Sequence, residues 1–123
     1  MTLSECYRLL GGSYEAVLLR LPSERSVRKF LQKFTEDTTL RELKECYDRG
    51  DLSGEFRAAH TLKGICLNLS LDRLLESSAA LTEFLRGASS VDAKAHKRLF
   101  TRVLSDYEGT CAVISQLESP SDL

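Results

Sequence analysis

Hydrophobic positions recur at three- and four-residue steps along most of the chain, and this spacing predicts helices. The clearest segment begins at Asp51, which can cap it, and runs to about Leu69, with one apolar stripe formed by Leu52, Phe56, Ala59, Leu62, Cys66 and Leu69. Such a stripe is typical of a helix that buries one face against a core. The sequence has no run of alternating β-branched residues that would predict strands. It therefore predicts an all-α protein.

Two further long segments follow with the same spacing. Ser70 can cap the first, which ends at Gly87 and turns inward Leu71, Leu74, Leu75, Ser78, Leu81, Thr82 and Leu85. The second begins near Asp92 and has a stripe of Phe100, Val103, Tyr107, Cys111, Ile114 and Leu117. We expect the tail, residues 119–123, to fray as chain ends commonly do.

The segment before Asp51 allows two interpretations. Ser23 can cap a helix that has Val27, Phe30, Leu31 and Phe34 on one face. The later apolar residues Leu40, Leu43 and Tyr47 do not continue that face. Thr39 and Glu42 can form a capping box that starts a new helix. The pattern fits either one bent helix over 24–49, with Gly50 as its end, or two helices broken near Asp37.

Residues 1–22 carry two shorter helical patterns, one with a capping box at Thr2 and Glu5 and one with a cap at Ser13. The longer amphipathic segments and their short connections predict an antiparallel, up-and-down four-helix bundle over residues 23–118. We expect the two short N-terminal helices to pack across one end of it. A chain of 123 residues with 42% hydrophobic residues is sufficient for one core.

Composition and charge exclude several classes of function. Lys and Arg number 17 and Asp and Glu 18, so a net charge of −1 gives no electrostatic footprint for nucleic acid or an anionic membrane. No apolar run approaches the roughly 20 residues of a membrane span, and the N-terminus lacks the features of a secretory signal. The four cysteines are widely spaced, which favours reduced thiols used as small apolar residues. We expect a cytoplasmic protein.

The two histidines occupy different settings. His96 lies near the start of the last predicted helix among charged neighbours, and we expect it to be exposed. His60 lies in the middle of its helix and outside the buried stripe. At about 100° per residue, it shares its face with Ser53, Arg57, Gly64, Leu67 and Asn68. The spacing therefore predicts an imidazole presented to solvent.

The neighbours of His60 add chemistry to that exposed face. Gly64 costs about 1 kcal/mol relative to Ala inside a helix, and it removes side-chain bulk one turn beyond the imidazole. Lys63 is close enough to place an ammonium beside a group attached to His60. Leu67 adds an apolar contact where a solvated helix normally has a polar residue. Together these residues indicate a docking surface that contains a nucleophile.

The run Ala58-Ala59-His60-Thr61-Leu62-Lys63-Gly64 resembles the signature of histidine phosphotransfer (HPt) domains. The similarity extends over about 100 residues and leaves out the first 22. It implies that His60 is the phosphorylated residue, that Lys63 is the electrostatic partner of the phosphate and that Gly64 provides clearance. Partner docking is expected at Arg57, Thr61, Leu67 and Asn68. The sequence departs from the family at Ser70, where Gly is common, and at Leu67, where a polar or small residue is common.

The resemblance implies a phosphorelay carrier of two-component signal transduction. It would accept a phosphoryl group from a receiver-domain aspartate or a histidine kinase and pass it to another receiver. A neutral imidazole is nucleophilic near pH 7, and the sequence has neither a Walker-type loop nor a kinase signature. We therefore expect a monomer that is not itself an enzyme and has no cofactor of its own, with Mg²⁺ on the partner receiver domain. Expected partners are receiver domains and a histidine or hybrid kinase.

An alternative is a helical module that docks receivers without phosphotransfer. The dimerisation domain of a sensor kinase is disfavoured because Thr61 follows the histidine where such domains usually have an acidic residue. A metal hydrolase would need a second ligand where Gly64 stands. The sequence names neither donor nor acceptor nor the direction of net phosphoryl flow, and the initial Met favours a free-standing carrier over part of a larger chain.

Overall fold

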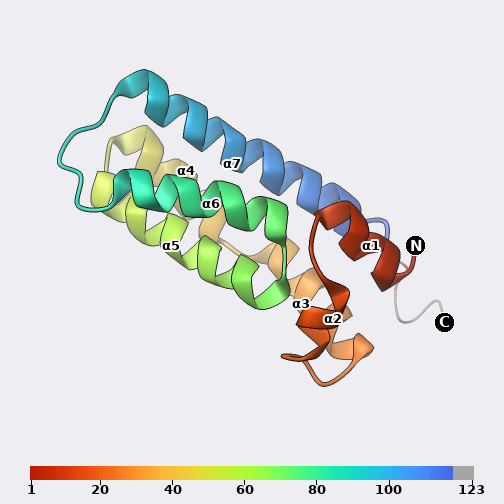
Figure 1. The fold of residues 1–123 in the computed structure, drawn as a ribbon. Helices are drawn as coiled ribbons and strands as arrows, with labels where there is room; N and C mark the ends of the chain where they lie inside the picture. Colours follow the sequence, from red (N-terminus) through yellow and green to blue (C-terminus); the bar gives the residue numbers. More distant parts are fainter. Residues whose placement is uncertain (118–123) are drawn as a thin grey trace.

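A computed structural model describes residues 1–117, and every regular element in that range is an α-helix (Figure 1). The predicted all-α class is confirmed. The helices are α1 (Leu3–Leu10), α2 (Tyr14–Leu18), α3 (Glu24–Glu36), α4 (Thr39–Arg49), α5 (Leu52–Leu69), α6 (Asp72–Leu85) and α7 (Ala93–Ile114). The tail for which we predicted fraying lies outside the described residues. Within them, no helix combines the length and apolar character needed to cross a membrane.

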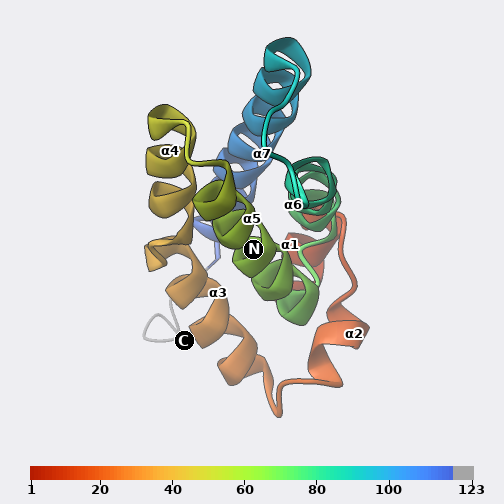
Figure 2. The ribbon, with the colours of Figure 1, turned by 90° about the vertical axis from the view of Figure 1, so that its left-hand side faces the viewer.

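The long helices pack side by side in the order of the chain. Helix α5 lies between α4 and α6, and α6 also packs along α7 (Figures 1 and 2). Their apolar stripes meet in one core, whose fully buried members include Leu31, Leu43, Leu62, Leu81 and Val103. This arrangement leaves one side of α5 facing solvent.

The segment that allowed two interpretations forms two helices, broken at Asp37 and Thr38. Asp37 has extended backbone, and its Oδ1 accepts a hydrogen bond of 2.8 Å from the backbone N–H of Thr39. The predicted capping box of Thr39 and Glu42 is wrong, because Thr39 already lies inside α4 and is buried. Figure 2 shows that the chain changes direction at this break, so that α3 and α4 are not collinear.

Most other predicted helix ends are confirmed. Thr2 and Glu5 form the reciprocal capping box of α1, and the last residues of α1 and α4 are followed by glycines in the left-handed conformation. Side-chain oxygens accept hydrogen bonds from first-turn N–H groups at Ser13, Ser23, Asp51 and Asp92. These caps satisfy backbone donors that have no partner within the helix.

Ser70 departs from its predicted role. It does not cap α6 but ends α5, with a φ of +55° that makes it the one non-glycine residue of positive φ within residues 1–117. Its hydroxyl oxygen accepts a hydrogen bond from Ser13 N at 3.0 Å, and the hydroxyl donates to Asp72 Oδ1 at 3.3 Å. These contacts stabilise a backbone conformation that usually favours glycine.

The N-terminal segment satisfies the last carbonyl groups of α5. The Tyr7 hydroxyl donates to the carbonyl of Leu69 at 2.8 Å. The Arg20 guanidinium donates to the carbonyls of Leu67 and Asn68 at 2.9 and 3.3 Å. Carbonyls in the last turn of a helix have no intrahelical donor. Residues near the start of the chain therefore complete the C-terminal end of α5.

The four cysteines are free thiols, and three of them are buried. Burial raises the pKa of Cys6 to about 11 and that of Cys66 to about 12. Both thiols therefore stay protonated at neutral pH and are poor nucleophiles. This agrees with their predicted use as small apolar residues.

Candidate functional site

His60 lies on the solvent side of α5 and is exposed, as the spacing predicts. Its neighbours Ala59 and Leu62 are buried in the core, so the backbone beneath the imidazole is anchored. One turn further along, a Cβ added at Gly64 would meet no heavy atom within 4 Å. The imidazole thus stands on a fixed helix with open space on its C-terminal side.

Glu83, in the last turn of α6, pairs with Arg86, which follows that helix. Arg86 donates two hydrogen bonds to the carboxylate of Glu83, from Nη2 at 2.8 Å and from Nε at 3.2 Å. These hydrogen bonds, with a further contribution from the positive charge of Lys63, hold the pKa of Glu83 below its usual value. Lys63 of α5 therefore lies near a carboxylate of α6.

Phe56 is a neighbour of His60 that is not among the predicted site residues. The apolar stripe of the helix predicts that Phe56 is buried, but it is half-buried. Its ring centroid lies 6.1 Å from that of His60, with an interplanar angle of 20°. The Arg86 guanidinium lies 5.2 Å from the Phe56 ring centroid. The four-residue spacing from Phe56 to His60 was a signal available in the sequence, whereas the contact with Arg86, at the end of α6, could be found only from the fold.

The four residues expected to dock a partner are all exposed on α5. The Arg57 guanidinium donates to the Ser53 hydroxyl at 2.9 Å, and the Thr61 hydroxyl donates to the Arg57 carbonyl. Leu67 exposes 52% of its surface, and Asn68 is exposed beside it. The structure thus presents all seven predicted site residues on one helix, with six of them exposed and Lys63 half-buried.

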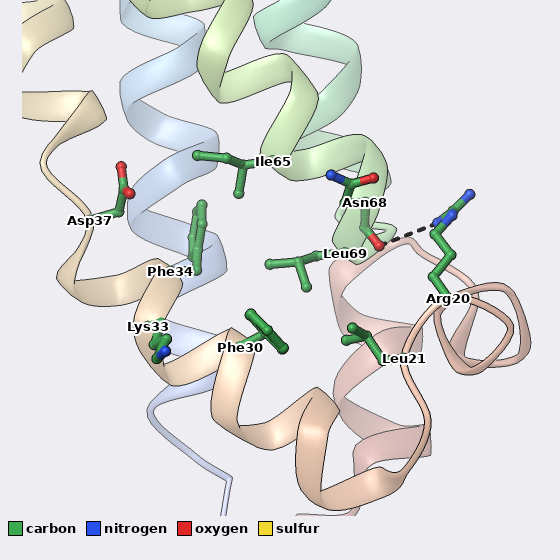
Figure 3. Close-up of a pocket in the computed structure, with 9 residues that line it drawn as sticks. All are labelled: Arg20, Leu21, Phe30, Lys33, Phe34, Asp37, Ile65, Asn68 and Leu69. Atoms are coloured by element: carbon green, nitrogen blue, oxygen red, sulfur yellow. Dashed lines mark hydrogen bonds between the residues drawn. The ribbon is translucent and has the colours of Figure 1, made fainter.

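A cavity of about 400 Å³ opens between α3 and the C-terminal half of α5 (Figure 3). Its apolar lining includes Phe30 and Phe34 from α3 and Ile65 and Leu69 from α5. Arg20, in the connection between α2 and α3, stands at its edge and is hydrogen-bonded to α5. The cavity lies beside the end of α5 that carries the exposed Leu67.

The prediction that His96 is exposed is wrong. Its side chain is 12% exposed, and Nε2 lies 2.7 and 2.9 Å from the two carboxylate oxygens of Glu55, which is fully buried. Tyr47 packs its ring against the imidazole with a centroid separation of 4.8 Å. Position 96 precedes Phe100 by four residues, so it extends the buried stripe of α7 by one turn. The His96 imidazole is therefore hydrogen-bonded to Glu55 inside the protein and is not presented to solvent.

Burial and pairing act in opposite directions on Glu55. Burial raises the pKa of the Glu55 carboxyl, while the hydrogen bond and charge of His96 lower it. Within residues 1–117, this site included, no three His, Cys, Asp or Glu side chains converge in a way that could hold a metal ion.

Comparison with known proteins identifies one family. The family model described as "Hpt domain" matches residues 25–112. The match begins in α3 and ends in α7, and it includes both histidines. Helices α1 and α2 precede it. No curated protein and no solved structure matches the chain.

Proposed function

Because the chain belongs to the Hpt domain family, which serves phosphorelays of two-component signalling, we propose that it carries a phosphoryl group on His60. The observation that supports this choice is the contrast between its two histidines. The His60 imidazole is exposed beside the open space at Gly64, whereas His96 is paired with a buried carboxylate. A nucleophile for a large partner must be accessible, and His60 meets that requirement.

The reaction follows from the chemistry of the imidazole. A ring nitrogen with a free lone pair attacks the phosphorus of an aspartyl phosphate in line, so that a P–N bond forms while the P–O bond to the aspartate breaks. The released aspartate carboxylate keeps the bonding electron pair. Reversal of this step on a second receiver domain completes the relay. Lys63 supplies positive charge near the phosphoryl oxygens, and Mg²⁺ is held by the receiver domain.

The proposed partners are receiver domains and a histidine or hybrid kinase. They would dock on the exposed face of α5 formed by Arg57, Thr61, Leu67 and Asn68. We interpret α3 with α4, α5, α6 and α7 as the antiparallel four-helix bundle of the family, with α1 and α2 packed at its end. In this proposal the protein is a cytoplasmic monomer that relays phosphate without kinase activity of its own.

The function is tested by phosphoryl transfer from receiver domains. The protein is mixed with a series of phosphorylated receivers carrying radioactive phosphate, and label on the protein is followed over time. We expect a label that is lost in acid and stable in base, which is the behaviour of phosphohistidine. Binding to receivers without any label would instead favour a docking module that does not transfer phosphate.

The clearance provided by Gly64 can be tested separately. We expect Gly64→Gln to slow transfer at least tenfold, because its side chain would occupy the space through which a receiver approaches. Gln is a better helix former than Gly, so the stability of the protein should stay equal or rise by up to about 1 kcal/mol. Transfer rates and urea unfolding measure the two effects.

Gly109 supplies a matched control for that substitution. It lies exposed in α7, and a Cβ added there also meets no atom within 4 Å. Gly109→Gln should therefore leave the transfer rate unchanged. Equal rates for Gly64→Gln and wild type would contradict the clearance role.

Leu67 is expected to contribute to receiver binding. Covering a half-exposed leucine is worth about 1–2 kcal/mol, so Leu67→Asp should raise the Kd for a receiver about tenfold. Leu19, which is 90% exposed at the end of α2, provides the control substitution Leu19→Asp. Affinities are measured by calorimetric titration, and identical values for Leu67→Asp and wild type would exclude Leu67 from the interface.

A further inference from the structure

Phe56 and Gly64 lie four residues on either side of His60 along α5. On the C-terminal side, the space at Gly64 is open. On the N-terminal side, the Phe56 ring lies nearly parallel to the imidazole, with centroids 6.1 Å apart. That separation is within the range at which aromatic rings attract one another. The imidazole therefore has an aromatic ring on one side and open space on the other.

The Phe56 ring is held in place from two directions. Its half-buried side chain packs against the core of the bundle. The guanidinium of Arg86, the residue that follows α6, lies 5.2 Å from the ring centroid, a separation that permits a cation–π interaction. Arg86 is in turn fixed by its two hydrogen bonds to Glu83. Exposed arginines normally sample many rotamers, and these contacts restrict this one.

We propose that Phe56, held by Arg86, is a positioning residue for His60 that restrains the rotation of its imidazole. The inference rests on the proposed role of His60 as the phosphorylated residue. An exposed histidine on a helix has several accessible rotamers, and in-line attack on phosphorus requires one of them. A fixed ring alongside reduces the number of orientations without covering the side from which a receiver approaches.

This role predicts a loss in the rate of transfer rather than in affinity for the receiver. A ring pair worth about 0.5–1.5 kcal/mol corresponds to a rate change of roughly two- to twelvefold. Phe56→Ala should therefore lower the single-turnover rate of transfer about two- to twelvefold, with the receiver Kd within about twofold of wild type. Phe56→Tyr retains the aromatic ring and should restore most of the rate. Arg86→Met, which keeps an apolar stem but removes the guanidinium, should give an intermediate rate.

Leu52→Ala is the matched control for lost packing. Leu52 is half-buried on α5 one turn before Phe56 and packs against the same core, but it lies two turns from His60. Its substitution should leave the transfer rate unchanged. In parallel, NMR of the imidazole carbon-bound protons of His60 should show, in Phe56→Ala alone, a loss of the ring-current shift caused by the aromatic neighbour.

The outcomes separate this inference from the proposed function. If wild type accepts phosphate neither from receivers nor from phosphoramidate, the proposed function is overturned and the positioning role with it. If wild type is active and Phe56→Ala transfers at the same rate, only the positioning role is overturned. A loss equal in Leu52→Ala and Phe56→Ala would show general loosening of α5 and would also overturn it.

Discussion

Substitution of His60 by Gln is expected to abolish labelling by phosphorylated receivers and to leave the fold intact. Glutamine has a similar size and polarity but no nucleophilic ring nitrogen. Because His60 is exposed and loses only its ring contact with Phe56, the substitution should lower the free energy of unfolding by no more than about 1.5 kcal/mol. Labelling is measured with radioactive phosphate, and folding by circular dichroism and urea unfolding.

The same variant should still bind the receivers that label wild type, because the surrounding face of α5 is unchanged. Retained binding with no label would assign the chemistry to His60 itself. Labelling of His60→Gln at the wild-type rate would refute the assignment and would direct attention to another acceptor in the chain.

The second large effect concerns stability. His96→Leu should lower the free energy of unfolding at pH 7 by about 3–5 kcal/mol, because it leaves the fully buried Glu55 carboxylate without its partner. The double variant Glu55→Leu, His96→Leu should recover much of this loss, since an apolar pair replaces the buried polar pair. Urea unfolding of the three proteins gives the comparison.

The deficit of His96→Leu should depend on pH in a defined direction. Burial raises the pKa of Glu55, and loss of His96 removes the contact that opposes this rise. A carboxyl whose pKa is raised by folding binds its proton more tightly in the folded state, so acid favours folding. The variant should therefore gain stability as the pH falls from 7 toward the ordinary pKa of Glu, about 4.3. If the loss of stability in His96→Leu grew as the pH fell, the unpaired Glu55 carboxylate could not be its cause.

The helical spacing was sufficient to place His60 on the solvent side of α5, because exposure on one helix depends only on the angle between positions. The contacts around it were beyond such reasoning. Phe56 could be selected by spacing, but its partner Arg86 follows α6, and local periodicity carries no information on how α6 is aligned with α5. The charged pair of Glu83 and Arg86 is different, because its three-residue spacing is a local signal that the sequence contains.

The error at His96 arose from a signal that was present in the sequence. Glu55 falls four residues before Ala59, on the buried stripe of α5, and a charged residue in that position requires a partner. His96 likewise falls four residues before Phe100 on the stripe of α7. Because Glu55 and His96 are both polar residues on buried stripes, the sequence could have indicated that they pair with each other. The break at Asp37 was recognised only as one of two possibilities, because a loss of phase fits either a bend or an interruption.

The hydrogen bonds from Tyr7 and Arg20 to the end of α5 can form only after the ribosome has made both partners. Tyr7 precedes its acceptor Leu69 by 62 residues. At about 5–20 residues per second, a ribosome takes roughly 3–12 seconds to span that interval. During this time α1 can contact α2, but its packing against α7 cannot yet form. Helix α1 therefore reaches its final contacts only after α5 has emerged.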